Sequence, residues 1–223
     1  IALSMISDDN FFFETKRDFA KEMVTGFIRL NGNTVGAVAN RSELVDEDGN
    51  TAETFDGVLT AAGCEKAAKF VEFCDAFSIP VLTLTNVKGY KADKHQERKI
   101  AKAVASMTYA FANATVPKVN VLVGAAYGSA YVAMNSKSIG ADLVFAWPQA
   151  SVGMMDAKSA ARIIYADELA KAENSAALLN EKTKAYAELQ SSALSAAKRG
   201  YVDNIIDAQD TRKYVIGAFE MLY

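Results

Sequence analysis

The chain has 223 residues, of which 51% are hydrophobic and 23% are charged, with only 3 prolines. A chain of this length hides about 70% of its extended surface on folding, which is enough for one large core, and its composition excludes disorder as the dominant state. The formal net charge of −3 argues against a dedicated nucleic-acid binder, for which a strongly basic face is expected.

The residues that commonly bind metals are scarce. Cys64, Cys74 and His95 cannot build a zinc site of the usual Cys/His kind, so we expect no metal. Two cysteines form no disulfide framework, which favours a reducing, cytoplasmic compartment. We find no signal peptide and no apolar run near the ~20 residues of a membrane span. The chain begins at Ile1 without a methionine, which indicates a fragment or an expressed domain.

The N-terminal region differs in character from the rest of the chain. Residues 1–22 mix the aromatic run Phe11–Phe13 with charges, and we interpret them as a linker or docking arm. Residues 23–223 contain no short-period repeat and no interior linker, which predicts one domain.

A hairpin opens this domain. Strand-like residues 23–30 and 34–40 flank Asn31-Gly32-Asn33, and Asn-Gly between apolar alternations is a strong hairpin signal. Acidic residues then crowd positions 42–56, which favours a solvated loop that turns at Gly49-Asn50.

Helices and strands then alternate. Apolar residues at helical spacing predict a helix around residues 67–77 and a second helix around 100–114. Each precedes a buried strand, and this alternation is typical of parallel α/β units. The strands are expected at 81–85, 119–123 and 143–146. A further helix is expected from Asp156 to Arg162. A long Ala-rich helical region then runs to Lys198 and ends at Gly200. A last helix is expected to start at Asp210, as its N-cap, and to run to Leu222.

Common catalytic motifs are absent from the sequence. It contains no G-x-S-x-G elbow, no phosphate-binding P-loop and no G-x-G-x-x-G fingerprint. A Ser-His-Asp triad would have to use His95, which lies in a charged stretch and is interpreted as a solvated surface residue. The basic residues of 88–102 are similarly interpreted as a solvated helix face, and Cys64 and Cys74 as packing residues.

The feature that we single out is the turn Tyr127-Gly128-Ser129-Ala130, which leads from the strand at 119–123 into a short helix. Small residues let a ligand approach the backbone, and the N–H groups of a helix's first turn lack internal partners. Such a turn can bind a developing oxyanion without a side-chain acid or base. Turns of this composition are also common packing features.

Several segments carry a family resemblance, in the family's own order. They are residues 18–20 with 24–32, 65–80, 114–119, 126–131, 136–142, 146–148 and 197–203. These segments resemble the C-terminal half of the carboxyltransferase component of biotin-dependent acyl-CoA carboxylases and decarboxylases. The family includes the propionyl-CoA carboxylase beta subunit and the methylmalonyl-CoA and glutaconyl-CoA decarboxylase alpha subunits.

The resemblance implies an α/β, crotonase-like fold, a spiral of ββα units with peptide N–H oxyanion holes. It implies that residues 23–223 form the biotin-binding domain, while acyl-CoA binds a second half contributed by another protomer. In the family's Tyr-Gly-Gly-Ala turn, N–H groups near the second Gly and the Ala hold the biotin ureido oxygen; Ser129 and Ala130 occupy these positions here. The implied cofactor-binding residues are Gly89, Tyr90, Tyr127, Gly128 and Tyr131.

The sequence departs from the family at positions that bear on activity. Ser129 replaces the second Gly of the turn, and Val132 stands where a polar residue often affects the choice of acyl group. Asn86 and Lys88 replace the Asp and Pro of a D-x-P-G-[FY] loop. Ser129, Asn86 and Lys88 keep one alternative open, a non-catalytic assembly subunit of the same complex. A second alternative is a crotonase-like acyl-CoA hydratase or hydrolase, for which Asp156 is the candidate acid.

The family's chemistry also implies cofactors and partners. Biotin is expected on a biotin carboxyl carrier protein, with a short-chain acyl-CoA as the substrate. The expected partners are the acyl-CoA-binding half and either a biotin carboxylase or a sodium-exporting membrane decarboxylase subunit. We expect a cytoplasmic homo-oligomer, associated with the membrane where the complex is a decarboxylase, and without appreciable activity when the acyl-CoA-binding half is missing. The sequence leaves open whether the complex carboxylates or decarboxylates.

Overall fold

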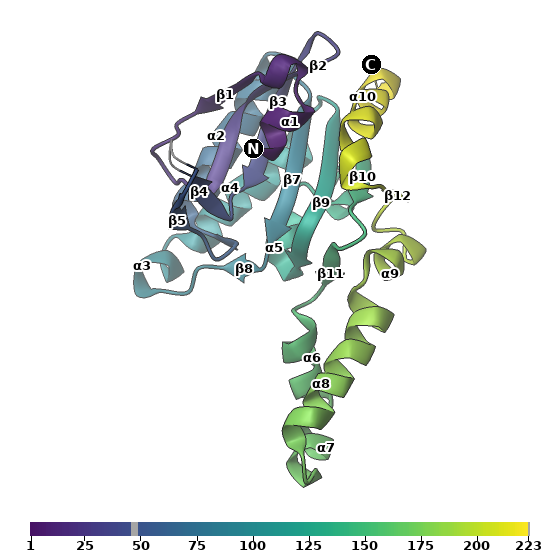
Figure 1. Ribbon diagram of the computed structural model, residues 1–223. Coiled ribbons are helices and arrows are strands. Elements are labelled where there is room, and N and C mark those ends of the chain that lie inside the picture. Colours follow the sequence, from purple (N-terminus) through teal and green to yellow (C-terminus); the bar gives the residue numbers. More distant parts are fainter. Residues whose placement is uncertain (46–48, 223) are drawn as a thin grey trace.

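A mixed sheet runs through the centre of the computed structural model, which describes residues 1–45 and 49–222 (Figure 1). In the described residues the strand order is β1-β2-β3-β7-β9-β10-β12, and β11 pairs with β9. The strands β1 to β3 are antiparallel neighbours, whereas β3, β7, β9, β10 and β12 are parallel. The strands are β1 (Phe12–Thr15), β2 (Met23–Leu30), β3 (Asn33–Asn40), β7 (Val81–Val87), β9 (Lys118–Tyr127), β10 (Leu143–Ala146), β11 (Ser151–Gly153) and β12 (Asn204–Ile205).

The predicted hairpin is confirmed. β2 and β3 pair from Met23↔Asn40 to Leu30↔Asn33. Asn31 and Gly32, the two turn residues, have φ angles of 52° and 80°. Two consecutive positive φ angles give the turn the twist that matches its flanking strands, which explains the preference for Asn-Gly.

One face of the sheet is covered by α2 (Ala61–Ala76) and α4 (Ile100–Asn113), the two helices that the apolar spacing predicted. The packing interpretation of Cys64 and Cys74 is confirmed, because both thiols are free and fully buried in this core. Burial raises the pKa of each thiol to about 12, so both stay protonated and unreactive at neutral pH.

The other face is covered by α1 (Ala2–Ile6) and α10 (Thr211–Leu222), which form a second core with the sheet. Leu3, Val215 and Phe219 are buried there. The last helix has the extent that the sequence predicted. Asp210, the expected N-cap, instead lies in a 3-10 turn at Ala208–Asp210 that leads directly into α10.

The N-terminal segment departs from the expected arm. It contains α1, a 3-10 turn at Asp8–Asn10 and then β1, which pairs with β2 at the edge of the main sheet. The hydroxyls of Thr15 and Thr25 lie 2.8 Å apart across this pair. The Phe run therefore alternates across a strand, because Phe12 packs into the second core while Phe13, 59% exposed, stacks on Phe27.

The expected acidic loop also differs in part. Glu43–Val45 (β4) and Thr51–Thr54 (β5) form a small antiparallel sheet instead of an irregular loop. Gly49 has a φ of 84°, in keeping with the expected turn. The acidic residues Asp46, Glu47 and Asp48 lie outside the described residues.

The helices that follow β11 extend away from the sheet and pack on one another (Figure 1). The expected Ala-rich helical region is broken, because Asn174 and Ser192 accept hydrogen bonds as N-caps and so start new helices. Gly200 ends the last of them with a φ of 80°, as predicted. The elements are α6 (Ala157–Ile164), α7 (Ala166–Lys171), α8 (Ser175–Tyr186), a π-helical turn (Ala187–Ser191) and α9 (Ala193–Lys198).

His95 is an exposed residue of the short helix α3 (Lys94–Glu97), which confirms its interpretation as a surface residue. Among the described residues, the structure contains no helix long and apolar enough to cross a membrane.

Candidate functional site

The predicted turn lies where two parallel strands end at the same edge of the sheet. β9 extends to Tyr127, beyond the predicted strand at 119–123. Its register with β7 shifts between Thr85 and Val87, and the side chain of Asn86 joins the two strands at this point. The Asn86 Oδ1 accepts a hydrogen bond of 2.9 Å from the Ala125 N–H. A Cβ at Gly124 would lie 2.6 Å from this oxygen, so the close approach requires glycine.

Asn86 also connects β7 to β3. Its own N–H donates to the Oδ1 of Asn40 at 3.1 Å. The asparagine that replaces the family's aspartate is therefore a hydrogen-bonded part of the sheet edge. Lys88, the second departure, has an exposed side chain, and its N–H donates to the Gly57 carbonyl at 2.7 Å.

A short helix, α5 (Gly128–Ala133), starts directly after β9 (Figure 1). Gly128 makes the change of direction with a φ of 58°. Tyr127 occupies the N-cap position, and no side chain caps the helix. The first N–H groups of a helix have no intrahelical acceptor, so they are available to a ligand oxygen. Ser129 is exposed at this end of the helix, whereas Ala130 is buried.

The predicted Gly89-Tyr90 loop lies against the same turn. These residues form β8, which pairs with β6 (Val58–Leu59). Burial raises the pKa of Tyr90, and a hydrogen bond with the Ser129 side chain partly offsets this rise. The structure thus brings together two predicted site residues that are 39 positions apart in the sequence.

The remaining predicted residues lie at the end of β9 and on α5 itself. The Tyr127 hydroxyl lies 3.0 Å from the Ser151 Oγ of β11. Tyr131 is buried, and its hydroxyl has no hydrogen-bond partner in the described part of the chain. Burial, with a smaller contribution from Tyr201, raises the pKa of Tyr131 to about 12. Val132 is half-buried on α5.

Sequence reasoning missed a buried polar network that holds the far end of α5. The Asn120 Nδ2 donates to the carbonyls of Met134 and Asn135, at 3.0 and 2.8 Å, and so caps the last carbonyls of this helical turn. The Thr85 hydroxyl donates to Asn120 Oδ1 at 2.8 Å. The Nδ2 of Asn135 in turn lies 3.2 Å from the Thr83 hydroxyl. Polar residues inside otherwise apolar strands are the sequence signal that could have revealed it.

Asp156, the candidate acid of the hydratase alternative, has a structural role instead. Its carboxylate accepts a hydrogen bond of 3.0 Å from the Ser159 N–H and caps α6. Hydrogen bonding to Ser159 holds the pKa of Asp156 below its ordinary value. A general acid needs a raised pKa, so this environment disfavours Asp156 in that role.

Comparison with known proteins identifies the family. Residues 2–223 match the carboxyl transferase domain, and the chain belongs to this family. It is 41% identical to a putative propionyl-CoA carboxylase beta chain of Bacillus subtilis, over 97% of this chain and 41% of that protein. It is 37% identical to the methylmalonyl-CoA decarboxylase subunit alpha of Propionigenium modestum, over 99% of this chain and 41% of that protein.

Solved structures show the same fold. The transcarboxylase 12S crystal structure, described as a hexamer with methylmalonyl-coenzyme A and methylmalonic acid bound, matches with a TM-score of 0.90 and 38% identity. The match covers 99% of this chain and 41% of that chain. The predicted crotonase-like α/β fold is therefore confirmed. The chain spans about two fifths of the length of the relatives that it matches.

Proposed function

We propose that this chain supplies the biotin-facing half of an acyl-CoA carboxyltransferase active site. The observation that carries the proposal is the uncapped N-terminus of α5, with Ser129 exposed and in contact with Tyr90. Peptide N–H groups without acceptors suit a neutral ureido oxygen, because they donate hydrogen bonds without requiring a countercharge.

Biotin on a carrier protein would supply the transferable carboxylate, bonded to its N1. The N–H groups of Ser129 and Ala130 would donate to the ureido oxygen and stabilise the negative charge that develops there as the carboxylate leaves. No side-chain nucleophile is needed, in keeping with the inert environments of Cys64 and Cys74. Gly89, Tyr90, Tyr127, Gly128 and Tyr131 would shape the surroundings of the ring, and Val132 would affect the choice of acyl group.

Ser129 is compatible with this role. Its side chain interacts with Tyr90, and this interaction lowers the pKa of Tyr90. The backbone N–H of a serine donates as well as that of a glycine does. The replacement of the family's second glycine therefore leaves the proposed donor in place.

The proposed partners follow from the relatives. We propose that acyl-CoA binds a second carboxyltransferase half, that biotin arrives on a carrier protein, and that the assembly is a homo-oligomer, as the 12S protein is. A biotin carboxylase or a membrane decarboxylase subunit would complete the complex, and the latter would place this chain beside a membrane.

The test is carboxyl transfer from methylmalonyl-CoA to biotin, measured with the chain alone and with a separately produced acyl-CoA-binding half. We expect no appreciable turnover by the chain alone and saturable turnover by the pair. Turnover by the chain alone would contradict the split site. A folded, associated pair without any turnover would favour the non-catalytic assembly subunit.

A further inference from the structure

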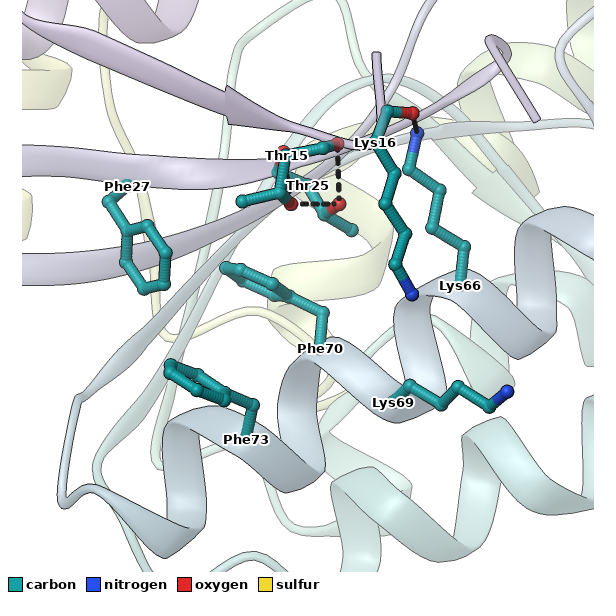
Figure 2. A pocket seen from close by; sticks show the side chains of 8 residues that line it. All are labelled: Thr15, Lys16, Thr25, Phe27, Lys66, Lys69, Phe70 and Phe73. Atoms are coloured by element: carbon teal, nitrogen blue, oxygen red, sulfur yellow. Dashed lines mark hydrogen bonds between the residues drawn. The ribbon is translucent and has the colours of Figure 1, made fainter. Parts of the chain in front are cut away.

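A cavity lies beside β1, at one end of the strand order and away from β9 and the α5 turn. It has a volume of about 220 Å³ and opens between β1, β2 and α2 (Figure 2). Phe27, Phe70 and Phe73 line its apolar side, and the Phe27 ring centroid lies 5.2 and 6.1 Å from those of Phe70 and Phe73. An enclosed cavity of about 150 Å³ lined by Leu, Ile and Phe accommodates benzene, so a volume of about 220 Å³ is large enough for a six-membered ring with a short substituent.

Three lysine side chains also line this cavity. Lys16, Lys66 and Lys69 line it, and no Asp or Glu lies among the lining residues. The Lys66 ammonium is occupied, because it donates to the carbonyls of Lys16, Phe19 and Ala20. In the described part of the chain, the ammonium groups of Lys16 and Lys69 have no ion-pair partner. Figure 2 shows the Lys16 side chain spanning from the end of β1 to α2, while Lys69 extends along α2.

Two carboxylates that act on Lys66, those of Glu14 and Glu22, also hold other partners. Glu14 pairs with Arg41 at 2.6 Å, and Glu22 bonds to the Thr60 hydroxyl. Burial lowers the pKa of Lys66, while the charges of Glu14 and Glu22 raise it and those of Arg41 and Lys16 lower it. Since Lys16 and Lys69 have no ion-pair partner among the described residues, an anion in the cavity would pair with charges that are otherwise only solvated.

The polar groups of the cavity restrict the ligand further. The hydroxyls of Thr15 and Thr25 bond to each other and to strand carbonyls, so they need no ligand. A phosphate or other strongly hydrated ion would lose its hydration against three aromatic rings without gaining enough donors. The lining suits a molecule that has one anionic group and an apolar body.

We propose that this cavity binds a compact monocarboxylate with an aromatic or aliphatic body. The phenylalanine rings would contact the apolar part, and the Lys16 ammonium, with Lys69 at the rim, would pair with the carboxylate. The site is separate from the α5 turn, because α5 follows β9 and the cavity lies beside β1, at the far end of the strand order.

Calorimetric titration of the 223-residue chain with phenylacetate tests this proposal. A ligand of this size is expected to bind with a dissociation constant of about 1 mM. The neutral isostere phenylacetamide and the Lys16→Gln variant should each weaken binding roughly 3- to 5-fold, the scale of one exposed ion pair. The matched variant Lys213→Gln changes an exposed lysine of α10 and should leave binding unchanged.

Thermal unfolding without ligand will show that each variant is folded, and Lys69→Gln provides a second reduction of charge, expected to weaken binding about 3-fold. The proposal is overturned if phenylacetate shows no saturable binding up to about 20 mM, a range that covers the expected affinity. It is also overturned if phenylacetamide binds equally well, or if Lys213→Gln weakens binding as much as Lys16→Gln does.

Discussion

Ala130→Pro in the complete carboxyltransferase is expected to lower kcat by roughly 10²- to 10³-fold, the scale of losing one oxyanion-hole donor. Proline has no N–H, so this substitution removes one of the two donors proposed to hold the ureido oxygen. Ala130 is buried near the start of α5, where the backbone N–H has no intrahelical acceptor, so its loss removes no hydrogen bond of the helix itself.

Two controls separate this loss from misfolding. Far-UV circular dichroism and thermal melting will show whether the proline variant keeps its fold. Ser129→Gly restores the family's turn, keeps every backbone donor and should leave kcat equal or higher. If Ala130→Pro stays folded and nearly fully active, the turn has only a structural role, and the assembly-subunit alternative gains support.

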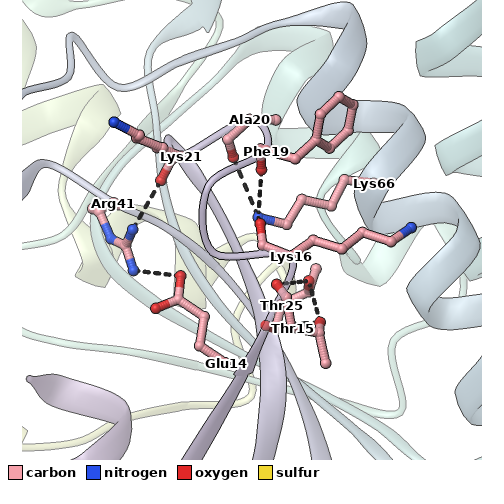
Figure 3. Close-up of polar contacts among 9 residues, drawn as sticks. All are labelled: Glu14, Thr15, Lys16, Phe19, Ala20, Lys21, Thr25, Arg41 and Lys66. Carbon is pink, nitrogen blue, oxygen red and sulfur yellow. Dashed lines mark hydrogen bonds and ion pairs between the residues drawn. The ribbon is translucent and has the colours of Figure 1, made fainter.

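Lys66→Met is expected to destabilise the chain by about 3 kcal/mol, because it removes the charged donor shared by three loop carbonyls. The Lys66 side chain is almost completely buried, and its ammonium holds the loop that joins β1 to β2 (Figure 3). It donates to the carbonyls of Phe19 and Lys16 at 2.8 and 2.9 Å. Lys16 and Ala20 have positive φ angles of 50° and 45°, so the loop depends on such contacts.

The measurement for Lys66→Met is the midpoint of thermal unfolding, which should fall by about 6–12 °C for a chain of this size. Lys69→Met is the matched control, since Lys69 lies on the same helix but is exposed, and its midpoint should change by less than about 2 °C. Equal midpoints for Lys66→Met and the parent chain would show that the loop does not depend on the buried ammonium.

Much of the fold could be predicted because its signals are local. The Asn31-Gly32 hairpin and the apolar stripe of α2 arise from residues close together in the chain, and the structure confirms both. The edge strand β1 was missed because four residues carry little periodicity, and its pairing with β2 decides its conformation. The region from α7 to α9 was predicted as one Ala-rich helical region, because its alanine-rich composition hides the caps at Asn174 and Ser192.

The candidate site was predicted only in part, because most of the contacts that hold it join residues far apart in the chain. The turn at Gly128 could be predicted because its run of small residues is a local signal, and the structure has α5 begin there. The contacts that hold it are not local, since Asn86 reaches Ala125 and Asn120 reaches Asn135. Lys66 is a similar case. Its position in the helical pattern predicts that it lies on the buried face of α2, but its hydrogen-bond acceptors lie about 50 residues earlier in the chain and could not be predicted.

The most direct test of the proposed biotin site follows each backbone amide of the ¹⁵N-labelled chain during a titration with biotinamide. This ligand keeps the ureido ring but lacks the carboxylate that the cavity beside β1 is proposed to bind. We predict that the amide resonances of Ser129 and Ala130 shift most, along a saturable curve, with Tyr90 following. The account is contradicted if these amides stay unmoved up to the solubility limit, or if the largest shifts fall on residues away from the α5 turn.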